Sequence, residues 1–194
     1  MKSILFFLIF ACAVPPKSAG FFEDDETTGD SMYHLAAETC HADVEGWSSI
    51  SHLMEMEVID FVNDMRSQQQ DCRSEGQFPP VHPLKYEPHL QCSSRYHSHW
   101  MAENGSLNHD SPGGDLGNDL YQRVENANYN GYAVGENIAA GYDSARSVVR
   151  GWMESDGHCS IIMSPDAEDI GVGYFMDEST VYLHWWTLNV GSVF

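Results

Sequence analysis

The order of the apolar patterns along the chain is the feature that most limits its possible folds. Apolar residues recur at helical spacing in three successive segments, and two aromatic-rich segments with the shorter period of a strand follow them. The predicted helices cover about residues 53–70, 88–104 and 145–157, and the predicted strands cover residues 170–175 and 180–190. Helices followed by a strand hairpin predict an α+β fold, and a length of 194 residues suits one domain with a single core.

The predicted helices carry recognisable ends. The second begins with Pro88, places His97 on its apolar face and ends at Asn104, while Ser144 (or Asp143) caps the third and Gly157 stops it. Residues 104–134 are rich in Gly, Asn and Asp and predict a loop with one short helix. The buried face of the first helix is expected to consist of apolar residues at intervals of three: Leu53, Met56, Ile59, Val62 and Met65.

The first residues predict export. A positive Lys2, an apolar run from Ile4 to Phe10 and the small residues around Ala13 have the arrangement of a secretory signal peptide, and the run is too short to span a bilayer. We expect residues 1–19 to be the signal peptide, with cleavage after Ala13 or Ala19, and a lipoprotein signal around Cys12 as the alternative. Residues 20–52 then form an acidic extension, residues 53–194 form the domain, and the mature protein is secreted.

The charge of the chain excludes one class of partner. There are 29 acidic and 9 basic residues, which give a formal net charge of −20. Such a surface repels phosphate groups, so neither nucleic acid nor an anionic membrane is expected as a partner.

Four widely spaced cysteines follow the predicted signal peptide. Cys40, Cys72, Cys92 and Cys159 form no Cys-x-x-Cys pair, which argues against a zinc knuckle or a redox dithiol. An even number of cysteines in an exported chain predicts two disulfide bonds, and spacing alone leaves all three pairings open. Asn104 begins an Asn-Gly-Ser glycosylation sequon.

Three polar clusters in these segments could carry chemistry. They are Asn108-His109-Asp110, the glycine-flanked Glu136-Asn137, and Ser155-Asp156-Gly157-His158 beside Cys159. Glycines next to a lone glutamate let the backbone pass close to its neighbours, so that one carboxylate can project into a cleft. His158 follows the glycine expected to stop the third helix, and the adjacent cysteine would fix its position.

The longer motifs around these clusters resemble a known family. GENIAAG, SVVRGWMESDGHCSIIMSP and IGVGY closely resemble the bacterial-type branch of the CAP/SCP superfamily (cysteine-rich secretory proteins, antigen 5 and pathogenesis-related-one proteins). VNDMR, PLKYEPHLQCSSRYHSHWM, LNHDSPGG and RVENANYNGY fall upstream in the family's order, so the match covers about residues 53–191. The resemblance implies a three-layer α-β-α sandwich with a small antiparallel sheet.

The resemblance also implies a site. Family members have a cleft lined by two histidines and two acidic residues, and in several of them the histidines bind a divalent metal. His109 and Glu136 match the first His and the first acidic residue, whereas Ser155 stands where other branches carry the second acidic residue. Their second His aligns within Trp185-Trp186-Thr187-Leu188 and is missing, but Ser155 and His158 match a Ser-x-x-His segment of the bacterial branch. The predicted cavity is therefore His109, Glu136 and His158 with Ser155 at its edge.

The same resemblance favours two further assignments. His109 and His158 would be the ligands of a weakly held divalent metal such as zinc, and neutral imidazoles suit that role. Bacterial-type members pair a Cys after the first helix with the Cys that follows Ser-x-x-His, which favours Cys72–Cys159 and leaves Cys40–Cys92 as the second bond.

Two functions follow as hypotheses. The first is a non-enzymatic secreted domain that binds a small apolar ligand or an extracellular protein partner. The second is a metal-dependent extracellular hydrolase acting on peptide or cell-wall bonds. A purely structural role for the polar cluster is the alternative to both. A Ser155–His158–Glu136 triad lacks a nucleophile elbow, so it is disfavoured.

Overall fold

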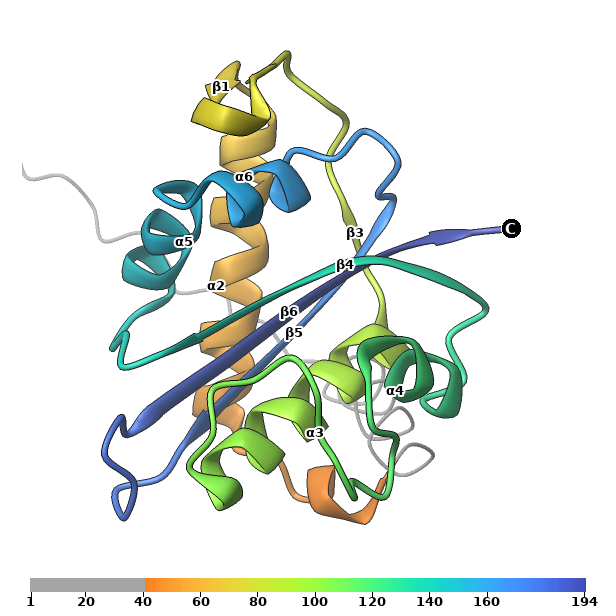
Figure 1. Cartoon of the computed structure of the whole chain (residues 1–194), viewed down its shortest axis with the longest axis vertical. Coiled ribbons are helices and arrows are strands. Elements are labelled where there is room, and N and C mark those ends of the chain that lie inside the picture. The colour runs from red at the N-terminus through yellow and green to blue at the C-terminus, as the bar shows by residue number, and fades with distance from the viewer. Residues whose placement is uncertain (1–40) are drawn as a thin grey trace, which may run out of the picture.

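A four-stranded sheet forms the middle layer of the molecule (Figure 1). The computed structural model describes residues 41–194. The strands lie in the order β3 (Lys85–Tyr86), β5 (Asp169–Met176), β6 (His184–Val193) and β4 (Gly131–Ala140). β3 runs parallel to β5, and the other two pairs are antiparallel. The predicted signal peptide, most of the acidic extension and Cys40 lie outside the described residues.

Helices cover both faces of this sheet. α3 (Pro88–Asn104) and α4 (Leu120–Asn126) pack on one face, and α2 (Ser49–Arg66), α5 (Ala145–Met153) and α6 (Asp156–Ile162) pack on the other. Two short 3₁₀ helices, η1 (Ala42–Val44) and η2 (Arg73–Glu75), and a small ladder of β1 (Gln70–Asp71) with β2 (Gln77–Phe78) complete the described elements. The predicted α+β fold and its three layers are confirmed.

The larger core lies between the sheet and α2, α5 and α6. It contains Val58 and Val62 from α2, the stripe of α5 that ends at Trp152, and the side chains of β5 and β6 that face these helices. Of the predicted α2 stripe, Leu53 is exposed. A spacing of three residues falls about 60° short of a full turn at each step, so positions so spaced drift off the buried face.

Glycines bring α3 against the other face of the sheet. A Cβ at Gly171 or Gly173 of β5 would overlap the backbone of α3, at Gln91 and Arg95 respectively. The helix begins with Pro88 in its first turn and ends at Gly105 in the left-handed region, so its predicted bounds are confirmed.

Two elements of the structure differ from the sequence prediction. Residues 131–134, expected to be loop, and residues 135–140, for which no helix or strand was predicted, form the edge strand β4. This strand pairs along β6 with a register shift between Ala133 and Gly135. The predicted third helix is two helices, because α5 ends at Met153 and Ser155 is the N-cap residue of α6. His158 therefore lies within α6 rather than after a helix end.

Two long-range links hold α6 against α2 and η2. Cys72 and Cys159, 87 positions apart, form the predicted disulfide bond, with their Cα atoms 5.5 Å apart. The buried guanidinium of Arg66 donates hydrogen bonds to the carbonyls of Ile162 (2.7 Å) and Ser164 (2.9 Å). Cys92 is also disulfide-bonded, but Cys40 lies outside the described residues, so the pairing Cys40–Cys92 stays a prediction.

No helix within residues 41–194 is long and apolar enough to cross a membrane.

Candidate functional site

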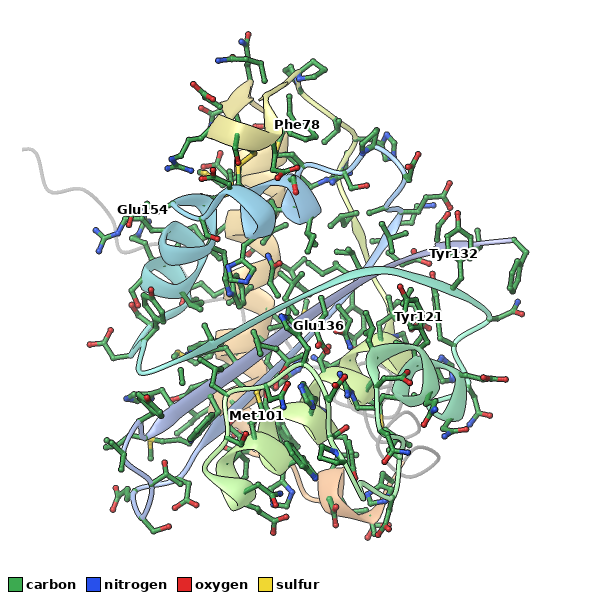
Figure 2. The ribbon with its side chains drawn as sticks, in the orientation of Figure 1. Phe78, Met101, Tyr121, Tyr132, Glu136 and Glu154 are labelled. Carbon is green, nitrogen blue, oxygen red and sulfur yellow. A yellow bond between two sulfur atoms is a disulfide. The ribbon has the colours of Figure 1, made fainter. Side chains whose placement is uncertain are left out.

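Glu136 is a buried carboxylate near the middle of β4. Its Cα pairs with that of Asn189 on β6, and its side chain, 2 % exposed, lies on the face of the sheet that α3 and α4 cover. Figure 2 shows Glu136 near the centre of the molecule, where the loop after α3 passes in front of the sheet. A carboxylate at such a place needs partners, because burial strongly disfavours an isolated charge.

Two hydrogen bonds supply those partners. Arg123 of α4 donates from Nη2 to Oε2 of Glu136 at 2.7 Å, and Nδ1 of His109 lies 2.9 Å from Oε1. Arg123 is itself buried and donates from Nη1 to the hydroxyl of Ser111 at 2.8 Å, which ties α4 to the loop that carries His109. Arg123 is a member of the site that the sequence analysis missed.

The ionisation of Glu136 fixes the tautomer of His109. Burial raises the pKa of Glu136, but the hydrogen bond from His109 and the charge of Arg123 outweigh it and leave this pKa below its ordinary value. An ionised carboxylate can only accept, so Nδ1 of neutral His109 carries the hydrogen and Nε2 carries the lone pair. The side chain of His109 is 55 % exposed.

His97 of α3 is the second residue that the predicted cleft omitted. Its ring is fully buried, with Nε2 2.9 Å from the carbonyl of Asn108 and 3.9 Å from Oε1 of Glu136. Burial lowers the pKa of His97 to about 4, and the charge of Arg123 adds to this effect while Glu136 opposes it. Among the described residues, Nδ1 of His97 has no hydrogen-bond partner. The sequence did place His97 on the apolar face of its helix, and that position was the available signal.

His158 and Ser155 belong to the opposite layer. Successive residues of a strand point to opposite faces, so Asn137 faces α6 while Glu136 faces α3, and Nδ2 of Asn137 donates to the carbonyl of His158 at 3.1 Å. Burial lowers the pKa of His158, and the charge of His109 lowers it further.

The structure gives two members of the disfavoured Ser155–His158–Glu136 triad other surroundings. Ser155 lies at the N-cap of α6 without a side-chain capping bond, and both oxygens of Glu136 are engaged by Arg123 and His109.

Within residues 41–194 no group of three or more His, Cys, Asp or Glu side chains is arranged to hold a metal ion. A metal held by His109 and His158 would thus depend on two imidazoles, and this assignment stays a prediction.

A second buried carboxylate lies between α2, α3 and β5. Glu55 accepts hydrogen bonds from the indole of Trp47 (2.8 Å), the amide of Gln91 (3.0 Å), the guanidinium of Arg95 (2.6 Å to Oε2) and the backbone nitrogen of Tyr174 (2.9 Å). Trp47 precedes α2, Gln91 and Arg95 lie on successive turns of α3, and Tyr174 lies on β5. The carboxylate therefore joins the two helical layers at this end of the sheet. This cluster was not predicted from the sequence.

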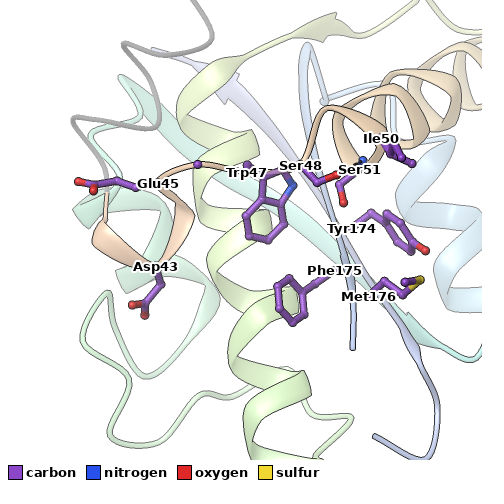
Figure 3. Close-up of a pocket in the computed structure, with 10 residues that line it drawn as sticks. Asp43, Glu45, Trp47, Ser48, Ile50, Ser51, Tyr174, Phe175 and Met176 are labelled. Atoms are coloured by element: carbon purple, nitrogen blue, oxygen red, sulfur yellow. Dashed lines mark hydrogen bonds between the residues drawn. The ribbon is translucent and has the colours of Figure 1, made fainter. Parts of the chain in front are cut away.

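A pocket of about 410 Å³ adjoins this cluster. The rings of Trp47 and Phe175, whose centroids are 5.6 Å apart, lie against each other in it, with Ile50 and Met176 on its far side (Figure 3). Its volume falls within the range of about 300–1,000 Å³ typical of small-molecule sites.

Residues 59–190 match the sequence profile of the cysteine-rich secretory protein family, CAP. The chain belongs to this family. The resemblance of the motifs to its bacterial branch is confirmed by YkwD of Bacillus subtilis and by the solved structure of an SCP-domain protein of Bacillus anthracis.

Two relatives come from Bacillus subtilis. The chain is 30 % identical to YkwD over 150 residues, which cover 77 % of this chain and 52 % of YkwD. It is 26 % identical to the membrane protein YlbC over 129 residues, which cover 66 % of this chain and 34 % of YlbC. The chain thus spans about half and about a third of the lengths of these two relatives.

Two solved structures share the fold. An extracellular protein of Bacillus anthracis that contains an SCP domain superposes with a TM-score of 0.58 and 26 % identity, covering 74 % of this chain and 41 % of that protein. An outer surface protein of Borrelia burgdorferi superposes with a TM-score of 0.55 and 16 % identity, covering 71 % of this chain and 94 % of that protein. The second likeness supports the fold alone.

Proposed function

We propose that this chain is an exported CAP domain that binds a ligand and does not catalyse a reaction. The observation that carries the proposal is the pair of Glu136 and His109, in which a buried, ionised carboxylate orients a half-exposed imidazole. The carboxylate has both oxygens engaged, so it serves as an orienting group rather than as a base or a nucleophile. Export is supported by the signal-like Lys2-led apolar segment and by the extracellular SCP-domain protein of Bacillus anthracis.

The oriented imidazole supports weak binding of a divalent metal. Histidines that ligate metals usually donate the other ring N–H to a carboxylate or a carbonyl, which is the arrangement of His109 with Glu136. His158, whose lowered pKa favours the neutral ring, would be the second ligand, and water would complete the coordination. The charge of Arg123 close behind Glu136 opposes a cation here, so only modest affinity is expected.

The pocket beside Trp47 supports the second part of the proposal, a small apolar ligand. Its walls are mainly the rings and aliphatic groups shown in Figure 3, and burial of apolar surface would supply most of the binding free energy. An extracellular protein that inserts one apolar side chain would use the same surface.

Zinc calorimetry tests the role of the His109 site. Chelator-stripped protein should bind zinc weakly at about pH 7.5 and much more weakly at about pH 5.5, because protonated imidazoles do not ligate metals. His109→Ala and His158→Ala should each weaken binding about tenfold or more, which corresponds to about 1.4 kcal/mol. His82→Ala, which removes an exposed histidine from the connector before α3, is the matched control and should bind as the wild type does.

Three results would contradict the proposal. The absence of zinc binding, or equal binding by His109→Ala, would leave the cluster as scaffolding. Hydrolysis of a peptide or cell-wall substrate that is lost with a chelator and restored by zinc would favour the metal-dependent hydrolase instead.

A further inference from the structure

A second pocket, of about 530 Å³, lies where α3 ends beside the loop that joins β5 to β6. The end of α3 contributes Glu103 and Asn104, and the loop contributes Asp177, Ser179 and Tyr182. Ala102, Gly105, Thr180, Val181 and Trp185 complete the lining. Neither His109 nor Glu136 lines this pocket, so it is distinct from the site described above.

The loop that forms one wall is held by its own hydrogen bonds. The backbone nitrogen of Asp177 donates to the carbonyl of Leu183 at 2.8 Å, and the hydroxyl of Thr180 donates to the carbonyl of Asp177 at 2.9 Å. The same hydroxyl oxygen accepts from Nε1 of Trp185 at 3.0 Å. Leu183 has φ 60°, a conformation that bulky residues rarely adopt and that the surrounding bonds must maintain. Because the loop is already ordered, it loses little conformational entropy when a ligand binds.

The wall presents an aromatic ring at the surface. The side chain of Tyr182 is half-exposed, and its ring meets that of Trp185 edge-on at a centroid distance of 5.4 Å. Gly141, which follows β4, lies close to this ring, because a Cβ added there would be 3.8 Å from Cδ1 of Tyr182. A fixed, half-exposed ring offers an apolar surface on which the C–H face of a sugar can pack.

The polar side chains that share this pocket with Tyr182 offer mainly hydrogen-bond acceptors. The exposed carboxylate of Glu103 lies 3.7 Å from His99 Nε2, and Asp177 binds Ser179 through Oδ1 only, which leaves Oδ2 without a partner among the described residues. Asn104 uses its Nδ2 on the carbonyl of Trp100, so its Oδ1 also remains to accept. Acceptors arranged beside an aromatic ring match the hydroxyl donors of a saccharide.

The charges of the lining narrow the ligand class. Two carboxylates in a protein of net charge −20 disfavour phosphates, sulfates and acidic sugars. A metal ion is not the expected occupant, because residues 41–194 contain no group of three or more suitable His, Cys, Asp or Glu side chains arranged to hold one. We propose that this pocket, which we call the Tyr182 pocket, binds a neutral saccharide or an amino sugar, with Tyr182 as the platform and Glu103, Asn104 and Asp177 as acceptors.

The Tyr182 pocket can be tested with three sugar trimers of different charge. Calorimetry or NMR titration would use the N-acetylglucosamine trimer (neutral), the glucosamine trimer (cationic) and the galacturonate trimer (anionic) at low millimolar concentrations. Protein from a bacterial host leaves Asn104 without a glycan, so the pocket is open to these probes. The first two trimers should bind and the third should not.

Substitutions of two pocket residues separate recognition from folding. Tyr182→Ala should weaken binding of the neutral trimer about tenfold or more, whereas Tyr182→Phe, which keeps the ring, should bind as the wild type does. Glu103→Gln should weaken binding of the glucosamine trimer more than that of the neutral trimer, because only the former carries a positive charge. Tyr121→Ala removes an exposed ring from α4 and is the matched control. The melting temperature of each variant confirms that the fold is retained.

Several outcomes would overturn the proposal. They are the absence of binding by both the neutral and the glucosamine trimers, equal or tighter binding of the galacturonate trimer, and unchanged binding by a folded Tyr182→Ala variant. Binding of tri-lysine without binding of either sugar would assign the surface to a cationic peptide instead. None of these outcomes bears on zinc binding by His109, so the inference stands or falls independently of the proposed function.

Discussion

Replacement of His97 by glutamine should make the domain more resistant to acid. Burial lowers the pKa of His97 to about 4, compared with an ordinary value of 6.5. Between these values the unfolded chain binds a proton that the folded chain excludes, so the free energy of unfolding falls as the pH falls through 6.5 and continues to fall until about pH 4. The full difference corresponds to about 3 kcal/mol, of which about 2 kcal/mol is lost between about pH 7 and pH 4.5.

Glutamine is the informative replacement for this histidine. Its amide nitrogen can occupy the place of Nε2 and donate to the carbonyl of Asn108, which His97 approaches at 2.9 Å, but it does not titrate. Urea unfolding followed by tryptophan fluorescence, with a chelator present, gives the free energy of unfolding at both pH values. The decrease from about pH 7 to pH 4.5 should be about 2 kcal/mol smaller in His97→Gln than in the wild type.

Glu136 loses its contribution mainly below the pH range of this comparison. Its pKa is lowered in the folded protein, so its contribution to stability is present above the ordinary carboxyl value near 4.5 and is lost as the pH falls below it. His82→Gln changes an exposed histidine and serves as the control. If His97→Gln and the wild type lose the same free energy over this range, burial of a neutral His97 is not a source of acid sensitivity and the reasoning is refuted.

Three further substitutions test the rest of the fold. Glu55→Gln leaves a buried guanidinium without its counter-charge and should cost about 3–5 kcal/mol in urea unfolding, whereas the exposed Glu57→Gln should change the free energy by less than about 0.5 kcal/mol. Serine at Cys72 and at its bridge partner should cost about 4 kcal/mol and lower the melting temperature, while retention of the wild-type melting temperature would contradict this role of the bond. Gly171→Ala should cost about 3 kcal/mol or more, because the new Cβ overlaps α3, and Gly157→Ala, where a Cβ meets nothing within 4 Å, should be neutral or stabilising by thermal unfolding.

The parts of the fold with local signals were predictable from the sequence. The bounds of α3 follow from Pro88 and Gly105, and the buried stripe of α5 follows from its regular spacing up to Trp152. β4 was not predictable in this way, because its glycines are needed for close contacts with residues that are distant in the sequence. A Cβ at Gly131, for example, would overlap the carbonyl oxygen of Ser192 on β6.

The same distinction separates the predicted residues of the site from those that were missed. His109 and Glu136 stand in motifs that resemble the family, and the structure brings them to 2.9 Å. Arg123 lies in a short polar helix whose sequence resembles any exposed helix, and only the contact with Glu136 reveals its role. Glu55 shares the face of Val58 and Val62 on α2, so its position on an apolar face was a signal that hydrophobic periodicity alone discards.

The position of Glu136 and Asn137 on β4 explains why one short motif serves the whole site. Because neighbouring strand residues face opposite ways, Glu136 holds His109 and Arg123 on the α3 side while Asn137 holds the backbone of His158 on the α6 side. β4 is the edge strand of the sheet, so groups from both helical layers can approach each other around it. For the proposed metal binding, both layers must therefore be in place so that the two imidazoles can act together, and the disulfide bond of the neighbouring Cys159 anchors the α6 side of this arrangement.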